Sequence, residues 1–271
     1  MNLNEIIWRN NYQLITIDPD DNNFSDPFYG SAFFLTYKKR IWFITANHVV
    51  HPDLFDYCIH RDNQEHPYEY KYFLVNNENS RIKLEELTHL LRFSFFYKHE
   101  QGIFSYEDLK NAGINAPSLF KIIDIALCEL KNVLPETFLT HRLSDVNENI
   151  LVKEGLTKLL ISSEQFIEPN INDQYFIYGA VKNKYIDEHN FNRCNAMHCN
   201  LQYVKEHEEQ YMFKNPTAIT QDEWQAISGS AVFNQDGKVV GIAVRIYLNS
   251  IMAIPSKTIL ELIDRVIEQN K

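Results

Sequence analysis

Three widely separated side chains have the types that nucleophilic acyl transfer requires. His48 follows the apolar run 43–46, Asp124 is a carboxylate in an otherwise apolar run, and Ser228 begins a Ser-Gly-Ser turn. A serine hydroxyl becomes a nucleophile when an imidazole removes its proton, and a carboxylate fixes the tautomer of that imidazole. A glycine directly after the serine permits a sharp turn that exposes the hydroxyl and directs backbone N–H groups at a developing oxyanion.

Each of these residues also has a structural interpretation when it is taken alone. A histidine at a strand end is commonly a hydrogen-bonded structural residue, and Ser-Gly-Ser is commonly just a turn. Asp124 is more informative, because burying a carboxylate is costly unless the group is paired or hydrogen-bonded, so it is expected to have a partner. Capping or ion pairing is the alternative role for Asp124, and only the combination of the three favours catalysis.

Taken in chain order, the three residues carry a resemblance to a known family. The chain resembles the trypsin-like (chymotrypsin-fold) serine peptidases, bacterial type, in Ile-Thr-Ala-Asn-His-Val around His48, Asp-Ile-Ala-Leu from Asp124 and Ser-Gly-Ser-Ala-Val-Phe from Ser228. The order His, Asp, Ser is also that of the family. The resemblance extends over residues 28–271, and three further segments agree with it: Gly30–Leu35, Val239–Ile242 and Ala253–Ser256.

The resemblance implies a mainly β fold of two antiparallel six-stranded β-barrels, with the active site in the cleft between them. His48 would be the general base and acid, Asp124 its orienting partner, and Ser228 the nucleophile. The chain would be a serine endopeptidase that cleaves peptide bonds of a restricted set of protein substrates through an acyl-enzyme. Backbone N–H groups of Ala226 and Ser228 would form the oxyanion hole, and neither a metal ion nor an organic cofactor would be needed.

Two residues of the nucleophile segment depart from the family pattern. Ala226 stands where the family usually has glycine, and alanine resists backbone conformations that glycine accepts. This predicts an oxyanion hole that is misformed until substrate or a partner binds. Ile227 replaces the acid that pairs with a newly cut N-terminus in self-activated members, so zymogen cleavage of the digestive type is not expected.

Two charged residues are candidates for substrate binding. Asp222 falls where family members that prefer Lys or Arg carry their pocket acid, but the surrounding loop 217–225 does not otherwise match, and an exposed loop acid is the alternative. Arg245 lies on the strand that returns beside the substrate, where it would bind an acidic side chain or simply be solvated. The cleavage specificity therefore stays open.

A cluster of possible metal ligands and several alternative catalytic residues compete with the triad. Cys194, His198 and Cys199 do not have a recognised zinc-site spacing, and no second pair follows, so no metal is predicted. Cys128 lies in the apolar segment of Asp124 and is expected in the core. The alternative base and the alternative acids lie in the next few residues after the triad histidine: His51, Asp53 and Asp56.

Two other functions compete with the endopeptidase. One is a catalytically silent binding or scaffold protein of the same fold, which Ala226 and the acidic surface favour. The other is a non-proteolytic esterase. Retention of all three candidate triad residues favours the enzyme, since a scaffold has no need of that set.

These residues must be positioned by strands, which dominate the pattern. Residues 30–36 and 40–46 are β-rich and flank a short polar loop, which predicts a hairpin. Asp236-Gly237 supplies a tight turn between two further strands. Other expected strands cover 70–75, 122–130, 174–179, 230–233 and 238–244.

Helices are expected in two places. Leu84, Leu87, Leu90 and Leu91 repeat at helical spacing, and 106–110 adds a short turn, so a helical insertion is predicted over 81–115. A closing helix is predicted over 256–269, with Thr258–Glu261 as a capping box and one apolar face. The predicted division is an N-terminal barrel over 1–140, with His48 and Asp124, and a C-terminal barrel over 141–271, with Ser228.

Composition limits the class of protein. The chain has 271 residues, 45% of them hydrophobic, which excludes a disordered chain or a small disulfide scaffold. There are 36 acidic and 26 basic residues, and this net charge of −10 argues against nucleic acid as a partner. The four scattered cysteines, and the lack of an export signal or an apolar span, predict a cytoplasmic protein without membrane contact. The expected partners are a protein or peptide substrate and an activating or regulatory protein.

Overall fold

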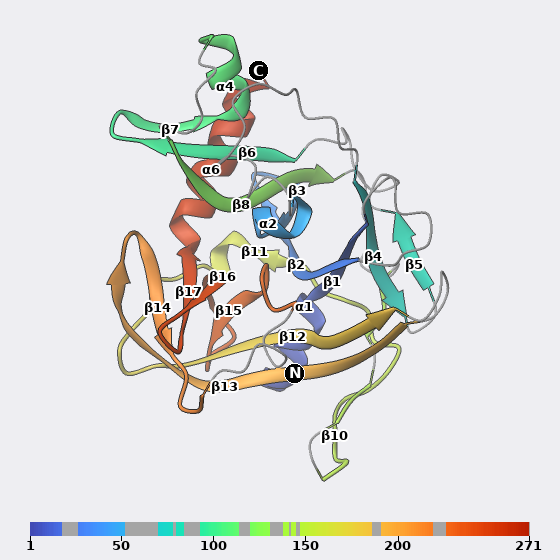
Figure 1. Ribbon diagram of the computed structural model, residues 1–271. Coiled ribbons are helices and arrows are strands. Elements are labelled where there is room, and N and C mark those ends of the chain that lie inside the picture. Colours follow the sequence, from blue (N-terminus) through green and yellow to red (C-terminus); the bar gives the residue numbers. More distant parts are fainter. Residues whose placement is uncertain are drawn as a thin grey trace.

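The computed structural model describes residues 1–17, 27–51, 70–77, 80–83, 93–113, 120–130, 138–140, 142–144, 147–185, 191–218 and 226–270 (Figure 1). Its architecture is mainly β. A sheet built from the first half of the chain lies beside a barrel built from the second half, and a long C-terminal helix runs from the barrel toward that sheet (Figure 1).

The N-terminal sheet positions His48 and Asp124. In the described part of the chain its strands follow the order β5-β4-β1-β2-β3-β8-β6-β7, and a ninth strand, β11, pairs in parallel with β2. Their bounds are β1 Tyr12–Ile17, β2 Phe28–Tyr37, β3 Arg40–Thr45, β4 Lys71–Asn77, β5 Ser80–Lys83, β6 Ser94–His99, β7 Gly102–Ser105, β8 Lys121–Leu130 and β11 Ile161–Ser162.

The C-terminal half forms the closed barrel that positions Ser228. Its order is β12-β13-β14-β17-β16-β15, which closes when β15 pairs with β12. The bounds are β12 Gln174–Tyr185, β13 Phe191–His207, β14 Gln210–Lys214, β15 Ala231–Asn234, β16 Val239–Tyr247 and β17 Ser250–Pro255. A separate small ladder joins β9 Leu143–Ser144 to β10 Ile150–Val152.

These findings confirm part of the predicted fold class. The chain is mainly β, and six described strands of its C-terminal half close into a barrel, consistent with a chymotrypsin-like fold. The second predicted barrel is not confirmed, because the N-terminal sheet, as described, ends at β5 on one side and β7 on the other. All barrel strands fall within the predicted C-terminal domain, 141–271, while the division into two domains stays a prediction.

The described helices are short, except for the last. They are α1 Leu3–Asn10, α2 Asn47–Val50, α4 Tyr106–Asn111, the 3-10 turn η4 Ser163–Gln165 and α6 Ser256–Gln269. The bounds predicted for the closing helix are confirmed, and its expected apolar face is buried: Ile259, Leu262, Ile263, Val266 and Ile267. The predicted capping box is wrong, because the helix begins two residues before Thr258, after Pro255 as N-cap, which has no side-chain cap bond.

The helical insertion predicted over 81–115 is wrong for the part that the structure describes. That part consists of β5, β6, β7 and a single short helix, α4, which contains the predicted turn 106–110. Aromatic residues favour strands, and Phe96 and Tyr97 are buried where β6 pairs with β8. The leucine repeat that suggested a helix lies within 84–92, outside the described residues.

The hairpin predicted from 30–36 and 40–46 is confirmed as β2 and β3. Its two-residue turn has φ of 49° at Lys38 and 62° at Lys39, as a type I′ turn requires, although neither residue is glycine. Lys38 forms an ion pair with Asp264 of α6, and the Tyr37 hydroxyl donates to the same carboxylate. The turn is thereby attached to the closing helix.

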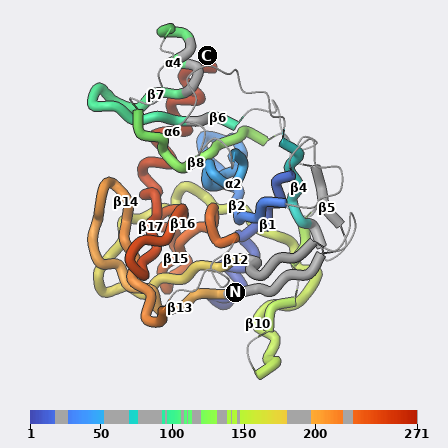
Figure 2. Tube along the Cα trace, viewed as in Figure 1, coloured from blue at the N-terminus to red at the C-terminus, as the bar shows by residue number. Residues whose placement is uncertain are grey.

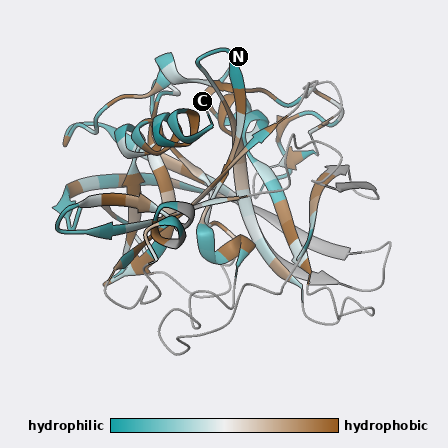
Figure 3. Ribbon diagram, turned by 90° about the horizontal axis from the view of Figure 1, so that it is seen from above, coloured by the Kyte–Doolittle hydropathy of each residue, from teal (hydrophilic) through white to brown (hydrophobic). Residues whose placement is uncertain are grey.

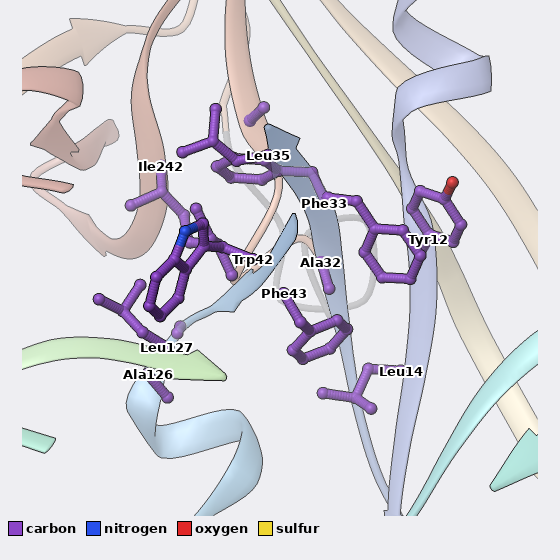
Figure 4. Packing of buried hydrophobic residues seen from close by; sticks show 14 of the residues in the cluster. Tyr12, Leu14, Ala32, Phe33, Leu35, Trp42, Phe43, Ala126, Leu127 and Ile242 are labelled. Carbon is purple, nitrogen blue, oxygen red and sulfur yellow. The ribbon is translucent and has the colours of Figure 1, made fainter. Parts of the chain in front are cut away.

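A single apolar cluster joins the sheet, the barrel and α6. Figure 4 shows part of this cluster, in which Tyr12, Phe33, Leu35 and Phe43 of the N-terminal sheet belong to the same packed group as Ile242 of β16. In Figure 3 the strands that cross the molecule carry brown, apolar stretches, and the helix at the C-terminus is brown on one side and teal on the other. The sheet and the barrel thus share a core, which holds the residues of the site at fixed positions.

The aromatic packing of β2 leads to a stability prediction. Phe34 is fully buried, with its ring 4.1 Å from that of Tyr12 and 5.6 Å from that of Phe138. We expect Phe34→Ala to lower the free energy of unfolding by about 3–5 kcal/mol, because the cavity forfeits these contacts. Phe28→Ala, on the same strand but 39% exposed, is the control and should cost far less in equilibrium urea unfolding. Equal losses would contradict a shared core centred on Phe34.

Candidate active site

Asp124 holds His48 at two points. β3 pairs with β8, so the chain that leaves β3 at Thr45 enters α2 beside Asp124. The backbone N–H of His48 donates to Asp124 Oδ1 at 3.0 Å, and His48 Nδ1 lies 2.8 Å from Asp124 Oδ2. One carboxylate therefore fixes both the start of α2 and the orientation of the imidazole ring.

Burial differs sharply between the two partners. The side chain of Asp124 is 9% exposed, whereas that of His48 is 32% exposed. The two hydrogen bonds offset the cost of burying the carboxylate, as the sequence predicted they must. An ionised carboxylate only accepts, so Nδ1 carries the donated proton, and in the neutral ring Nε2 is left as a base.

The charge of Asp124 changes the titration of His48. Burial by itself lowers the pKa of the imidazole, but the negative charge of Asp124 and the hydrogen bond to it raise the pKa, and the net direction is upward from the ordinary 6.5. The carboxylate thus stabilises the imidazolium, which is the form that a base takes after it has accepted a proton.

The Ser228 turn requires glycine at the next position. The turn closes through a hydrogen bond from Ser230 N–H to Ile227 O at 2.9 Å, and it leads directly into β15. Gly229 has φ of 94°, and a Cβ there would lie 1.8 Å from the carbonyl oxygen of Ser31. Only glycine fits this contact, so the turn lies directly against β2.

Ser31 attaches the Ser228 turn to the strands that carry His48. Its N–H donates to Ser228 O at 2.8 Å, and its hydroxyl donates to Ala226 O at 2.7 Å. The Thr45 hydroxyl, at the end of β3, donates to Ser31 O at 2.8 Å. The Ser228 turn is therefore anchored to the β2–β3 pair, and His48 lies three residues after Thr45, the last residue of β3.

The Ser228 hydroxyl lies beside β16. Its Oγ is 3.5 Å from Val244 O, at the long limit of a hydrogen bond. β16 has an irregular register between Ala243 and Arg245, and Gly229 N–H donates to Ala243 O at 2.8 Å. The serine is thus placed between β2 of the sheet and β16 of the barrel.

Ala226 adopts the conformation that alanine was expected to resist. Its φ is 68°, in the left-handed region, at a cost of about 1–2 kcal/mol for a residue with a Cβ. The bond from the Ser31 hydroxyl to its carbonyl holds it there. Within the described residues, the N–H groups of Ala226 and Ser228 have no acceptor, which is the state that an oxyanion site requires.

The other predicted residues lie apart from this group or outside the described residues. Arg245 Nε donates to Gln210 Oε1 at 3.0 Å, and Arg245 Nη2 lies 3.5 Å from Glu208 Oε2, so its guanidinium is already engaged within the protein. His51 packs among the rings of Tyr70, Tyr72 and Phe93 and not against Asp124. The remaining candidate acids lie outside the described residues: Asp53, Asp56 and Asp222.

Only part of the candidate metal-ligand set has described side chains, because that of Cys194 lies outside the described residues. No group of three His, Cys, Asp or Glu side chains in the described part of the chain could hold a metal ion. His198 and Cys199 lie on β13, as does the backbone of Cys194. Cys128 is buried in β8, as predicted.

Sequence reasoning missed Ser31, Thr45 and Val244, which position the site. Their hydrogen bonds join residues far apart in the chain, so no local spacing reveals them. One signal was present in the small residues of Gly30-Ser31-Ala32, since small side chains permit close approach of other segments. A Cβ on Gly30 would lie 2.2 Å from Val49 Cγ1, which shows how tightly α2 packs on this strand.

Comparisons with known proteins add little. No protein-family model matches the chain, and no curated protein matches it. Among solved structures, the active form of the Rv3671c protease from M. tuberculosis matches with a TM-score of 0.41 and 8% identity, over 94% of this chain and 79% of that one. A likeness this distant carries no argument, so the function is argued from the site itself. Among the described helices, none has the length and apolar character to cross a membrane.

The pairing of His48 with Asp124 predicts the titration of the imidazole. We expect the His48 pKa to lie above 6.5 and to fall in Asp124→Asn, because the amide carries no charge to stabilise the imidazolium. The pairing should stabilise the fold most below the unfolded-state pKa and lose this contribution as pH rises through the folded-state pKa. Two-dimensional imidazole NMR measures the shift, with exposed-ring histidines as internal references. An unchanged His48 titration in Asp124→Asn would refute the pairing.

Proposed function

We propose that this chain is a serine endopeptidase with a His48-Asp124-Ser228 triad. The observation that carries the proposal is the pair of hydrogen bonds between Asp124 and His48, which gives the imidazole a tautomer whose Nε2 can act as a base. The turn that contains Ser228 is bonded to the same strand pair that leads to His48. A structural histidine needs no such fixed tautomer, and a structural turn needs no pair of unused N–H groups.

The proposed reaction begins with proton transfer to His48. Ser228 Oγ attacks the carbonyl carbon of a peptide bond while His48 Nε2 takes the hydroxyl proton, and the Oγ–C bond forms as the carbonyl π electrons move to oxygen. The C–N bond then breaks, and His48 gives its proton to the leaving amine. Water, deprotonated by the same imidazole, releases the acyl group from Ser228. Asp124 stabilises the imidazolium throughout and is not itself protonated.

The N–H groups of Ala226 and Ser228 are the proposed oxyanion donors. They flank Ile227, which is almost fully buried, and the left-handed backbone at Ala226 is fixed by the Ser31 hydroxyl. Donors fixed before the reaction stabilise the oxyanion without reorganising, and loss of one typically costs about 10²–10³ in rate. Ser31 would therefore support catalysis without touching the substrate.

Among the residues that the structure describes, the edge of β16 beside Ser228 has no further strand partner, and this supports an extended peptide as the substrate. The ladder between β15 and β16 runs from Phe233↔Val239 to Ala231↔Ile242, and beyond Ile242 the described partner of β16 is β17 on its other side. The segment Val244–Tyr247 therefore offers backbone groups to which a peptide can add as a strand. Its solvent-facing side chains would contact the residues that precede the cleaved bond.

The proposal extends to partners and location. Protein or peptide substrates are proposed, together with an activating or regulatory protein, and no metal or organic cofactor takes part in the steps above. A cytoplasmic location, without nucleic acid or membrane as a partner, is also proposed, on the scattered cysteines and the net charge of −10. A peptidase in that location must have a restricted substrate range.

A catalytically silent binding protein is the second candidate. One observation favours it: the Ser228 hydroxyl is directed to Val244 O at 3.5 Å, and a serine held on a strand carbonyl does not attack. Such a protein would use the same strand edge of β16 to bind an extended peptide without cleaving it. The two candidates differ only in whether Ser228 reacts, so one reagent distinguishes them.

Covalent labelling with a fluorophosphonate tests the proposal. We expect the wild-type chain to be labelled at Ser228, as mapped by mass spectrometry, and labelling to vanish in Ser228→Ala and in His48→Ala. Asp124→Asn should fold and lose about 10⁴ in kcat, the loss that removal of the equivalent acid causes in a serine protease. His99→Ala, a histidine on β6, is the control and should react normally.

Three outcomes would overturn this assignment. Labelling that survives His48→Ala at full rate would remove the base from the mechanism. A wild-type chain that stays unlabelled, yet binds an extended peptide in a way that substitutions in Val244–Tyr247 abolish, would establish the binding protein instead. Turnover of esters without cleavage of any peptide would point to the esterase.

A further inference from the structure

The N-terminal segment reaches the nucleophile turn through Asn11. This residue follows α1 and is 4% exposed, and its Nδ2 donates to Tyr178 O at 3.0 Å and to Ser230 Oγ at 3.2 Å. The Ser230 hydroxyl in turn donates to Tyr178 O at 2.6 Å. One side chain near the start of the chain thus bonds a residue that lies two positions after Ser228.

Asn11 is itself fixed by a buried lysine. Lys158 is 4% exposed, and its ammonium donates to Trp8 O at 2.8 Å and to Asn11 O. The same ammonium lies 4.2 Å from the centre of the Trp8 ring, a cation–π contact. A positive charge is favourable at the C-terminal end of a helix, and the carbonyls there are also bonded from outside the helix, so the end of α1 has a defined position.

The hydrogen bond from Asn11 to the Ser230 hydroxyl attaches the turn 226–230 through a side chain on the side of the barrel. The backbone of Ser230 is already used, since its N–H donates to Ile227 O and its carbonyl accepts from Ala243. Only the hydroxyl of Ser230, fully buried, is left to join the turn to another segment. This hydroxyl accepts a hydrogen bond from Asn11 and donates one to the carbonyl of Tyr178 in β12.

The strand that Asn11 holds also packs against the turn. Gly179 follows Tyr178, and a Cβ on Gly179 would lie 2.7 Å from Ile227 Cγ1 and 3.4 Å from Ala226 O. The Tyr178 carbonyl accepts hydrogen bonds from both Asn11 and Ser230. The next residue, Gly179, is the one against which Ala226 and Ile227 pack. Figure 2 shows the N-terminus beside β12, in agreement with this contact.

We infer that Asn11 is a positioning residue for Ser228. The turn 226–230 is held between two supports, Ser31 on the sheet side and Asn11 with Tyr178 on the barrel side, and removal of either lets the hydroxyl and the two N–H groups leave their positions. The kinetic consequence rests on the proposed function, whereas the mechanical link between the N-terminal segment and the turn does not. Asparagine suits the role because its amide supplies both of the N–H donors that Tyr178 O and Ser230 Oγ accept.

Asn11→Asp and Ser230→Ala are the variants that test this inference. Asn11→Asp keeps the shape of the side chain and removes both donors, and Ser230→Ala removes the hydroxyl that joins the segments. The matched control is Asn10→Ala, because Asn10 is 2% exposed and its amide donates to Ile6 O within α1 and not to the turn. Its substitution weakens the same helix without breaking the link.

The first readout is the reaction of Ser228 at a temperature at which all variants are folded by circular dichroism. We expect Asn11→Asp and Ser230→Ala to lower kcat for an ester substrate by about 10–100-fold, with KM nearly unchanged, because a small displacement of the nucleophile costs that much. The variant with both substitutions should be no slower than the slower of the two single variants, because the two substitutions break the same hydrogen bond between Asn11 and Ser230. Asn10→Ala should keep the wild-type kcat.

The second readout does not depend on turnover. Hydrogen exchange of the peptide that covers 226–234 should be faster in Asn11→Asp and Ser230→Ala than in the wild type, and unchanged in Asn10→Ala. A wild-type chain that never reacts at Ser228, with faster exchange in the two variants, would overturn the proposed function and leave the link intact. Exchange and kcat in Asn11→Asp equal to those of Asn10→Ala would overturn the positioning role.

Discussion

A buried carboxylate whose charge must be stabilised by hydrogen bonds organises this site. Asp124 lies in the middle of β8, between apolar neighbours, where an ionised group is unfavourable unless its oxygens are satisfied. Both oxygens are satisfied by His48, one by its backbone N–H and one by its ring. This requirement explains why the start of α2 lies against β8 and why the imidazole of His48 has one defined tautomer.

The segment that contains Ser228 depends on contacts from outside the barrel that carries it. Ser31 of the sheet bonds the carbonyls of Ala226 and Ser228, and Asn11 of the N-terminal segment bonds the hydroxyl of Ser230. Other contacts of this segment come from the barrel itself, since the Ser230 hydroxyl donates to Tyr178 O of β12 and the Gly229 N–H donates to Ala243 O of β16. The position of Ser228 is therefore a property of the assembled chain and not of its C-terminal half alone, which fits the apolar cluster shared by the sheet, the barrel and α6.

Much of the fold could be predicted from the sequence where the signal is local. The β2–β3 hairpin, the Asp236-Gly237 turn and the apolar face of α6 depend on residue type and short spacing, and all three are as expected. The predicted capping box of α6 was wrong, because the pattern at Thr258–Glu261 occurs inside a helix that already begins at Ser256, after Pro255. The strands β6 and β7 were missed because a leucine repeat nearby suggested a helix, whereas β6 pairs with β8 and β7 pairs with β6.

The site shows the same division. His48, Asp124 and Ser228 were identifiable because each stands out chemically in its own segment, and the partner expected for Asp124 is His48. Ser31, Asn11 and Lys158 were not, because ordinary polar residues become informative only when distant segments meet. Ala226 shows the opposite error. Because alanine disfavours the left-handed backbone conformation, the sequence suggested that Ala226 would not adopt it. In the structure Ala226 is left-handed, and the Ser31 hydroxyl bonds its carbonyl.

The most direct test is a crystal structure of the chain with a peptide boronic acid, which forms a tetrahedral adduct with an activated serine. The account predicts a bond between boron and Ser228 Oγ, one boronate oxygen accepting from the N–H groups of Ala226 and Ser228, and His48 Nε2 within hydrogen-bond distance of the adduct while Nδ1 stays on Asp124. An adduct on any other residue, or a His48 ring directed away from the boronate, would contradict the catalytic assignment.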